Sequence, residues 1–98
     1  MSAPLTLADE VQASPDAVTA DLGAEAVVLE LGRGRYYGMP GPAASIWRAL
    51  QAPARLADVA EALLREYDVD GDRCRRELLE LVDALEDRGL VRRLGPAA

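Results

Sequence analysis

The feature that most constrains the fold is a pair of short apolar stretches, Ala26 to Leu31 and Arg35 to Met39, on either side of Gly32-Arg33-Gly34. Two such stretches joined by a tight, glycine-containing turn are typical of an antiparallel β-hairpin. The second stretch runs into Met39-Pro40-Gly41-Pro42, in which neither proline can donate a hydrogen bond to a sheet. We therefore expect the second strand to stop there and a helix to begin at Pro42.

Residues of the first stretch alternate between the two faces of the expected strand. Val27, Leu29 and Leu31 share one side of the expected strand, whereas Val28 and Glu30 lie on the other. Since the first set contains no charged residue, we expect it to face the core.

The second stretch has two adjacent tyrosines on opposite faces. Tyr37 shares its face with Met39, and Tyr36 shares the other with Gly38. Because backbone N–H groups also alternate in direction, one pair points its hydrogen bonds at the first strand and the other pair points outward. We expect one tyrosine in the core and the other at the outer edge, and alternation alone does not decide which.

The remaining chain predicts one more strand and three helices. Either residues 11–14 or residues 17–21 can pair with the hairpin, and the sequence does not choose between them. Apolar residues at helical spacing predict helices at about residues 42–51, 56–67 and 72–88. Strands followed by a separate run of helices indicate an α+β fold, here a winged helix-turn-helix-like arrangement of a three-stranded antiparallel sheet and three helices.

Single residues complete this expectation. Trp47 is expected in the core, Asp70 as the N-cap of the third helix and Gly89 at its end. With 98 residues, the chain is expected to form one domain over residues 1–98, with residues 1–10 and 92–98 loosely ordered.

Composition narrows the possible functions. The chain has no His and one cysteine, Cys74, which is expected to be buried in the third helix. Without His, the usual general base and the commonest metal ligand are missing, so we predict no catalytic residues, no metal and no cofactor. No apolar run approaches the ~20 residues that cross a bilayer, and no secretory signal is recognised, so a cytoplasmic protein without a membrane partner is expected. A net charge of −6 argues against general binding to nucleic acid.

Several short motifs follow one another in a characteristic order. They are VVLEL, RYYGM, Ile46-Trp47, Leu56-x-x-Val59-x-x-x-Leu63, Tyr67-Asp68-Val69-Asp70 and Leu81-x-x-x-Leu85-x-x-x-Gly89-Leu90. Together, over about residues 11–91, they resemble the PqqD-like family of recognition elements for ribosomally synthesised, modified peptides (RiPP recognition elements). The family tends to have Leu-Asn-x-Thr-Gly-Ala before the first helix, where this chain has Met39-Pro40-Gly41-Pro42-Ala43-Ala44, so a different entry to that helix is expected.

The resemblance implies a non-catalytic protein that captures the leader segment of a precursor peptide and presents it to a leader peptidase or modifying enzyme. Length and composition are similar to the free-standing versions of lasso-peptide pathways, which act with a separate leader peptidase. The leader is implied to add as an antiparallel strand along Arg35 to Met39, between that strand and the third helix. The expected binding residues are Arg35, Tyr36, Tyr37, Gly38, Met39, Arg75, Leu79, Val82, Asp83 and Glu86. Core packing is the alternative for Leu79 and Val82.

A winged-helix DNA-binding transcription regulator is the alternative function. Arg73, Arg75 and Arg76 lie at the start of the third helix, where a recognition helix would carry them. The same helix continues with five acidic residues, which would repel phosphate groups: Glu77, Glu80, Asp83, Glu86 and Asp87. Leader-peptide binding is therefore the preferred interpretation.

Overall fold

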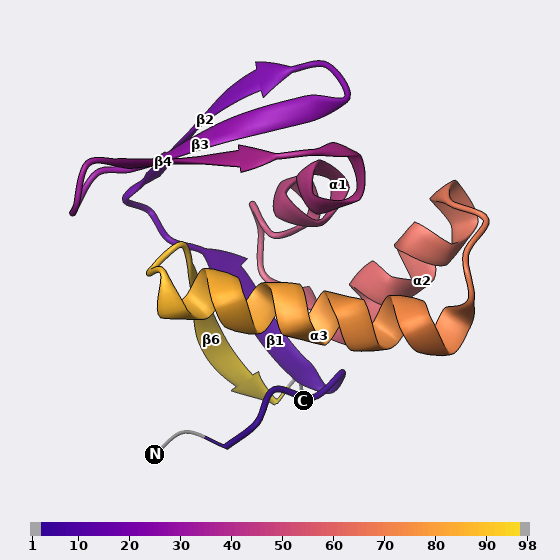
Figure 1. Cartoon of the computed structure of the whole chain (residues 1–98). Helices are drawn as coiled ribbons and strands as arrows, with labels where there is room; N and C mark the ends of the chain where they lie inside the picture. Colours follow the sequence, from indigo (N-terminus) through magenta and orange to yellow (C-terminus); the bar gives the residue numbers. More distant parts are fainter. Residues whose placement is uncertain (1–2, 97–98) are drawn as a thin grey trace.

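The computed structural model describes residues 3–96, in which two small antiparallel sheets and three helices form an α+β fold (Figure 1). The elements are β1 (Asp9–Ala13), β2 (Ala17–Leu22), β3 (Glu25–Glu30), β4 (Arg35–Met39), α1 (Gly41–Ala49), β5 (Ala54–Arg55), α2 (Leu56–Glu66), α3 (Gly71–Asp87) and β6 (Val91–Pro96). The strand order β2-β3-β4 forms what we call the hairpin sheet, and β5-β1-β6 forms the second sheet. The expected fold class, a three-stranded antiparallel sheet with three helices, is confirmed.

Both candidate segments for a further strand are strands, in different sheets. The segment Ala17–Leu22 is β2 and pairs antiparallel with β3 along its whole length, from Ala17 opposite Glu30 to Leu22 opposite Glu25. The segment Asp9–Ala13 is β1 and lies at the centre of the second sheet. The question that the sequence left open is thereby answered in favour of β2.

The ends of the described chain are more ordered than expected. Asp9 and Glu10 belong to β1, and β6 pairs with β1 so that Gln12 lies opposite Arg92. The expectation of loosely ordered ends is therefore wrong for residues 9–10 and 92–96, while residues 97–98, like residues 1–2, lie outside the described part of the chain. The partner strands are about eighty residues apart in sequence. No local pattern signals such a pairing.

The core face of β3 is the opposite of the expected one. Ala26, Val28 and Glu30 are buried, whereas Leu31 is 56% exposed just after the strand. The Glu30 carboxylate accepts hydrogen bonds from the turn N–H groups of Gly32, at 2.9 Å, and Arg33, at 2.8 Å. A charged group that is satisfied in this way can be buried, so the usual assignment of the charged face to solvent fails here.

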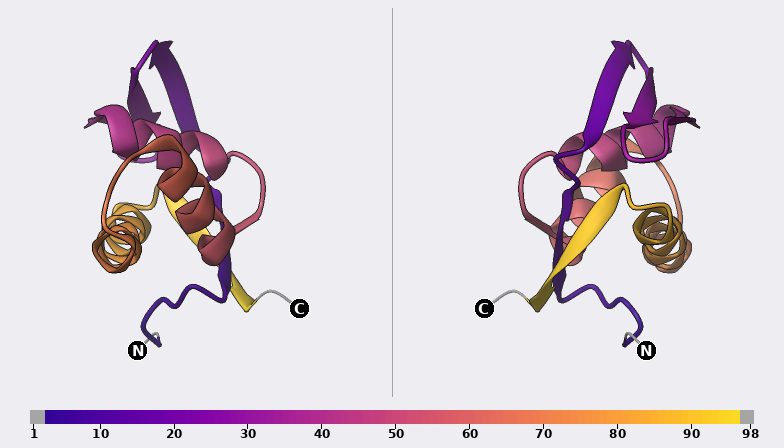
Figure 2. Two further views of the ribbon diagram at one scale, coloured as in Figure 1. Left: turned by 90° about the vertical axis from the view of Figure 1, so that its right-hand side faces the viewer. Right: turned by 90° about the vertical axis from the view of Figure 1, so that its left-hand side faces the viewer.

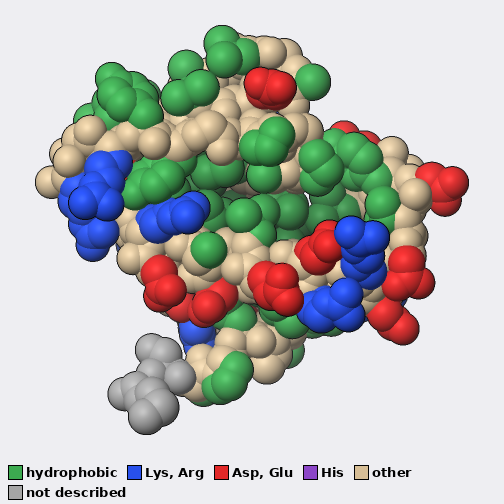
Figure 3. Space-filling model, viewed as in Figure 1, with side chains coloured by type: hydrophobic (Ala, Val, Ile, Leu, Met, Phe, Trp, Pro, Cys, Tyr) green, Lys and Arg blue, Asp and Glu red, His purple; other side chains and the backbone are tan. Residues whose placement is uncertain are grey.

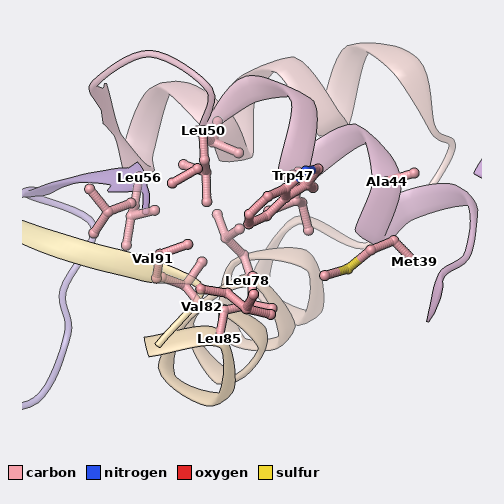
Figure 4. Packing of buried hydrophobic residues seen from close by; sticks show 14 of the residues in the cluster. Met39, Ala44, Trp47, Leu50, Leu56, Leu78, Val82, Leu85 and Val91 are labelled. Carbon is pink, nitrogen blue, oxygen red and sulfur yellow. The ribbon is translucent and has the colours of Figure 1, made fainter. Parts of the chain in front are cut away.

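The core joins all the larger elements. Trp47 is fully buried, as expected, and its indole N–H donates to the Thr19 hydroxyl at 2.8 Å, which fastens α1 to β2. Figure 4 shows Trp47 packed near Leu78 and Leu50, with Leu56 beyond Leu50 on the side of Val91. Viewed end-on in Figure 2, α3 stands beside β1 and β6 and below the hairpin sheet.

The ends of α3 also agree with the sequence. The Asp70 carboxylate accepts a hydrogen bond from the Arg73 N–H at 2.9 Å, as an N-cap does. Gly89 has a φ of 75°, the left-handed conformation that ends a helix, and the following Leu90 is fully buried. This fixes α3 at both ends relative to the sheets.

Replacing Glu30 with Ala is expected to lower the free energy of unfolding by roughly 2 kcal/mol, because two turn N–H groups lose a charged acceptor. Urea denaturation followed by the fluorescence of Trp47 measures this. Glu25→Ala, at the exposed start of the same strand, is the matched control and should change stability by no more than ~0.5 kcal/mol. Equal losses in the two variants would contradict the role given to the Glu30 carboxylate.

Candidate functional site

One long side of β4 has no partner strand among residues 3–96. In the hairpin sheet β4 pairs with β3 alone, so its other edge is open. An open edge presents unpaired N–H and C=O groups and is a template for a further strand. The site is therefore built outward from this edge.

The register of the hairpin shows which residues point outward. The Leu31 N–H donates to the carbonyl oxygen of Asp16, at 3.0 Å, on the β2 side. Because backbone groups alternate along a strand, every second residue of β3 bonds toward β2 and those between bond toward β4. Tyr37 lies opposite one of the latter, so its hydrogen bonds are directed at β3. We infer that Tyr36 and Gly38 turn their N–H and C=O groups to the open edge.

The two tyrosines differ in the same way in their side chains. Tyr36 projects from the outer face of the hairpin sheet and is 72% exposed. Tyr37 is half-buried on the inner face, where the guanidinium carbon of Arg88 lies 5.3 Å from the centre of its ring. This answers the question that alternation left open, because Tyr37 faces α3 and Tyr36 carries the outward backbone groups.

The wall opposite the open edge is one flank of α3. Arg88, at the end of the helix, reaches the Tyr37 ring, and Glu77 and Leu81 line a hollow together with Pro40 at the end of β4. Residues 77, 81 and 88 are four and seven positions apart, so they share one face of the helix. This flank faces β4.

The flank predicted from the sequence is a different one. Val82 is completely buried, so the core-packing alternative holds and it is not a wall of the groove. Glu86 binds Arg93 of β6, with the shortest N to O distance at 2.9 Å, so its flank faces the second sheet, and Leu79 lies on the same side seven residues earlier. Arg75 pairs with Asp72 at 3.6 Å, and Asp83 is exposed to solvent.

The two flanks differ because a helix has one on either side of its core stripe. Leu79 and Leu81 are both partly buried and both border the stripe. The spacing of apolar residues gives the direction of the core, but it does not say which sheet lies on which side. In this protein the second sheet, which the sequence did not reveal, covers the flank that carries Leu79.

An apolar hollow of about 720 Å³ adjoins the open edge at the end of β4. It is lined by the strand end, α1, the second half of α2, the α2–α3 connection and α3 as far as Leu81. Its lining residues are Pro40, Pro42, Ala43, Ile46, Leu63, Tyr67, Asp68, Val69, Asp70, Arg73, Cys74, Glu77, Leu78 and Leu81. Figure 3 shows hydrophobic side chains in the depression between the upper part of the molecule and α3.

Most of these residues were missed because each has a plausible structural role in the sequence. The segment Met39-Pro40-Gly41-Pro42 was interpreted only as the end of the strand and the entry to a helix. In the sequence, Leu81 is spaced with the apolar residues that face the core, such as Leu78 and Leu85. The signal that was available is Val69, an apolar residue in a polar connection, which is 51% exposed and lines the hollow.

The rim of the hollow has one ion pair. The Arg73 Nε donates to Glu77 Oε1 at 2.9 Å, and this hydrogen bond, with the attraction of the Glu77 charge, raises the pKa of Arg73. Both side chains are exposed, so the pair keeps a charged rim without contributing much to stability.

Residues 3–96 offer neither a cluster of metal ligands nor a membrane-spanning helix. Across these residues, no group of three His, Cys, Asp or Glu side chains is arranged to hold a metal ion. No helix in this part of the chain is long and apolar enough to cross a membrane.

Comparison with known proteins gives this geometry a context. The family model described as "Coenzyme PQQ synthesis protein D (PqqD)" matches residues 25–91, more than half of the chain. The chain belongs to the PqqD family. Among curated proteins, none matches it at a significant level.

Two solved structures resemble this PqqD-family protein over most of their length. "TbiB1 in Complex with the TbiA(beta) Leader Peptide" is 30% identical, with a TM-score of 0.78, and the alignment covers 89% of this chain and 99% of that one. "Lasso peptide synthetase B1 complexed with the leader peptide" is 28% identical, with a TM-score of 0.74 and coverage of 84% and 96%.

Proline substitutions along β4 test the directions of its backbone groups. Tyr36→Pro and Gly38→Pro remove N–H groups that point to the open edge, so each should lower the free energy of unfolding by less than ~1 kcal/mol. Tyr37→Pro removes a hydrogen bond to β3 and should lower it by roughly 2–3 kcal/mol. Urea denaturation of the three variants measures the difference. If Tyr37→Pro were the best tolerated, the register would be wrong.

Proposed function

We propose that this protein binds the leader segment of a ribosomally synthesised precursor peptide, which adds as an antiparallel strand to the open edge of β4. The observation that carries the proposal is the combination of this edge with the adjoining hollow, on a fold whose two solved relatives are named as complexes with leader peptides.

Energetics assign separate tasks to the edge and the hollow. A backbone hydrogen bond contributes ~1 kcal/mol net, whereas ordering a peptide residue costs ~1–2 kcal/mol. Pairing with Tyr36 and Gly38 therefore fixes the register of the peptide without supplying net affinity. Burying an apolar side chain contributes ~1.5–3 kcal/mol, so one or two apolar anchors in the hollow supply the affinity.

The antiparallel direction predicts where these apolar anchors lie in the sequence of the ligand. A strand that runs antiparallel to β4 passes Met39 first and Arg35 last. Peptide residues that precede the paired segment consequently lie beyond Met39, over the hollow lined by Pro40, Ile46 and Leu81. The Tyr, Pro and Leu anchors that the family resemblance implies would occupy this place, N-terminal to the paired residues.

The protein acts without catalysis of its own. It holds the precursor and presents it to a separate leader peptidase or modifying enzyme of lasso-peptide biosynthesis, and so raises the local concentration of substrate there. The acidic outer face of α3, with Glu80, Asp83 and Asp87 exposed, favours a peptide over DNA as the ligand.

Loss of the outward N–H at position 38 is expected to weaken leader binding. Gly38→Pro should raise the Kd at least about tenfold, because the proline ring removes a hydrogen-bond donor and obstructs the edge. Fluorescence anisotropy measures the change, with a labelled leader peptide of a lasso-peptide precursor that has been selected for measurable binding to the wild-type protein.

The matched control is Gly38→Ala, which keeps the N–H. A Cβ at this position meets no atom within 4 Å, so the Kd should stay within about twofold. Unchanged binding by a folded Gly38→Pro variant would remove strand addition as the mode of binding.

Two leucines on opposite flanks of α3 test the hollow. Leu81→Ala should weaken leader binding roughly five- to tenfold, because Leu81 lines the hollow and its truncation removes apolar contact area. Leu79→Ala deletes the same atoms from a similarly half-buried residue on the flank toward the second sheet, and it should leave the Kd unchanged. Anisotropy titration of both folded variants distinguishes the flanks, and a larger effect of Leu79→Ala would restore the flank predicted from the sequence.

A further inference from the structure

The end of the groove opposite the hollow is basic. Arg33 and Arg35 lie where the hairpin turn enters β4, and Arg88 lies where α3 ends. All three are exposed, and none forms an ion pair with another residue of the described chain, although Arg48, Arg73 and Arg93 do. In a protein with a net charge of −6, three unpaired cations beside a binding edge require an explanation.

Arg88 is the best placed of the three. Its guanidinium carbon lies 5.3 Å from the centre of the Tyr37 ring, which holds the side chain across the gap between α3 and β4. A guanidinium carries its five N–H donors in its own plane, so contact with the ring leaves them available. Among the described residues, none accepts a hydrogen bond from them.

A bound strand brings peptide side chains to this position. If Tyr36 and Gly38 pair with the peptide, the peptide residue opposite Tyr37 points to the same face as Tyr37, toward α3. The residue two positions later lies opposite Arg35 and points the same way. Both side chains approach Arg88 from the end of the groove at which an antiparallel peptide leaves it.

We propose that Arg88, assisted by Arg35, determines ligand specificity by binding an Asp or Glu of the peptide on its inward face, C-terminal to the apolar anchors. This inference rests on the proposed function. It specifies the order of residue types along the peptide: apolar residues come first and bind in the hollow, and a carboxylate follows and binds the arginines. A bidentate contact of guanidinium with carboxylate would also fix the direction in which the peptide lies.

A display library of random linear peptides, selected on the immobilised full chain, provides the probe. We expect the enriched peptides to align with apolar residues followed by Asp or Glu. Synthetic, labelled versions of one enriched peptide, with the acid and with Lys in its place, are then titrated by anisotropy against Arg88→Gln and Arg88→Glu. The acidic peptide should bind each variant roughly five- to tenfold more weakly, and the Lys peptide should recover affinity for Arg88→Glu.

Arg76→Glu is the matched control, because it makes the same change of charge on an exposed residue of α3 that faces away from β4. Its Kd should stay within about twofold of wild type at 0.15 M salt. The same loss in Arg76→Glu, or no preference for acids among the enriched peptides, overturns the role of Arg88.

The proposed function has a separate readout. If the enriched peptides bind a folded Gly38→Pro variant as well as wild type, strand addition itself fails. If they lose binding to Gly38→Pro but are indifferent to Arg88→Glu, strand addition stands and only the specificity inference fails.

Discussion

The pairing of β3 with β4 is the constraint on which the rest of the site depends. A shift of this register by one residue would exchange the faces of both tyrosines and turn the backbone groups of Tyr36 and Gly38 inward. The turn holds the register in place, because the buried Glu30 carboxylate binds the N–H groups of two turn residues. Gly32 is part of the same device, since a Cβ there would lie 2.6 Å from a carboxylate oxygen of Glu30. A buried charge that looks like a defect of the core is therefore what orients the binding edge.

An open strand edge is ordinarily a liability, because it can pair with another copy of the chain. Here the β4 edge is short and carries Arg35, with Arg88 close to its inner face. If two β4 edges paired antiparallel, Arg35 of each copy would lie opposite Met39 of the other and would gain no counter-ion there, whereas a peptide with an acid near its C-terminal end would neutralise the arginines. The positive charge of the arginines thus favours binding of an acidic peptide over pairing with a second copy of the chain.

The local elements of the fold were predictable from the sequence, and their distant relations were not. The hairpin turn, the buried Trp47 and both ends of α3 follow from short-range chemistry, namely glycine conformation, apolar spacing and side-chain caps. The second sheet joins segments near opposite ends of the chain, and no turn connects β1 directly to β6, so no local pattern predicts their pairing. Because that sheet decides which flank of α3 is covered, the sequence alone could not show that the flank facing β4 carries Leu81 and the flank toward the second sheet carries Leu79. The inward position of Glu30 was missed for a related reason. Its hydrogen-bond partners are backbone N–H groups, and the residue types in the sequence do not show that these groups are available to it.

In the proposed mode of binding, the division of tasks among these elements would allow one small surface to accept several related peptides. Backbone pairing at β4 is indifferent to side chains, so it sets register for any extended segment without Pro at the paired positions. The hollow favours large apolar side chains. Because it is bounded by the α2–α3 connection and by Pro40 and Pro42, it selects for the shape of a side chain more than for a particular residue. The charge of Arg88 then acts at the far end of the groove. The apolar anchors and the carboxylate of a peptide reach the hollow and Arg88 together only when the peptide runs antiparallel to β4. Discrimination in such a site comes from the order of weak requirements along the peptide, and changing one of them shifts preference without abolishing binding.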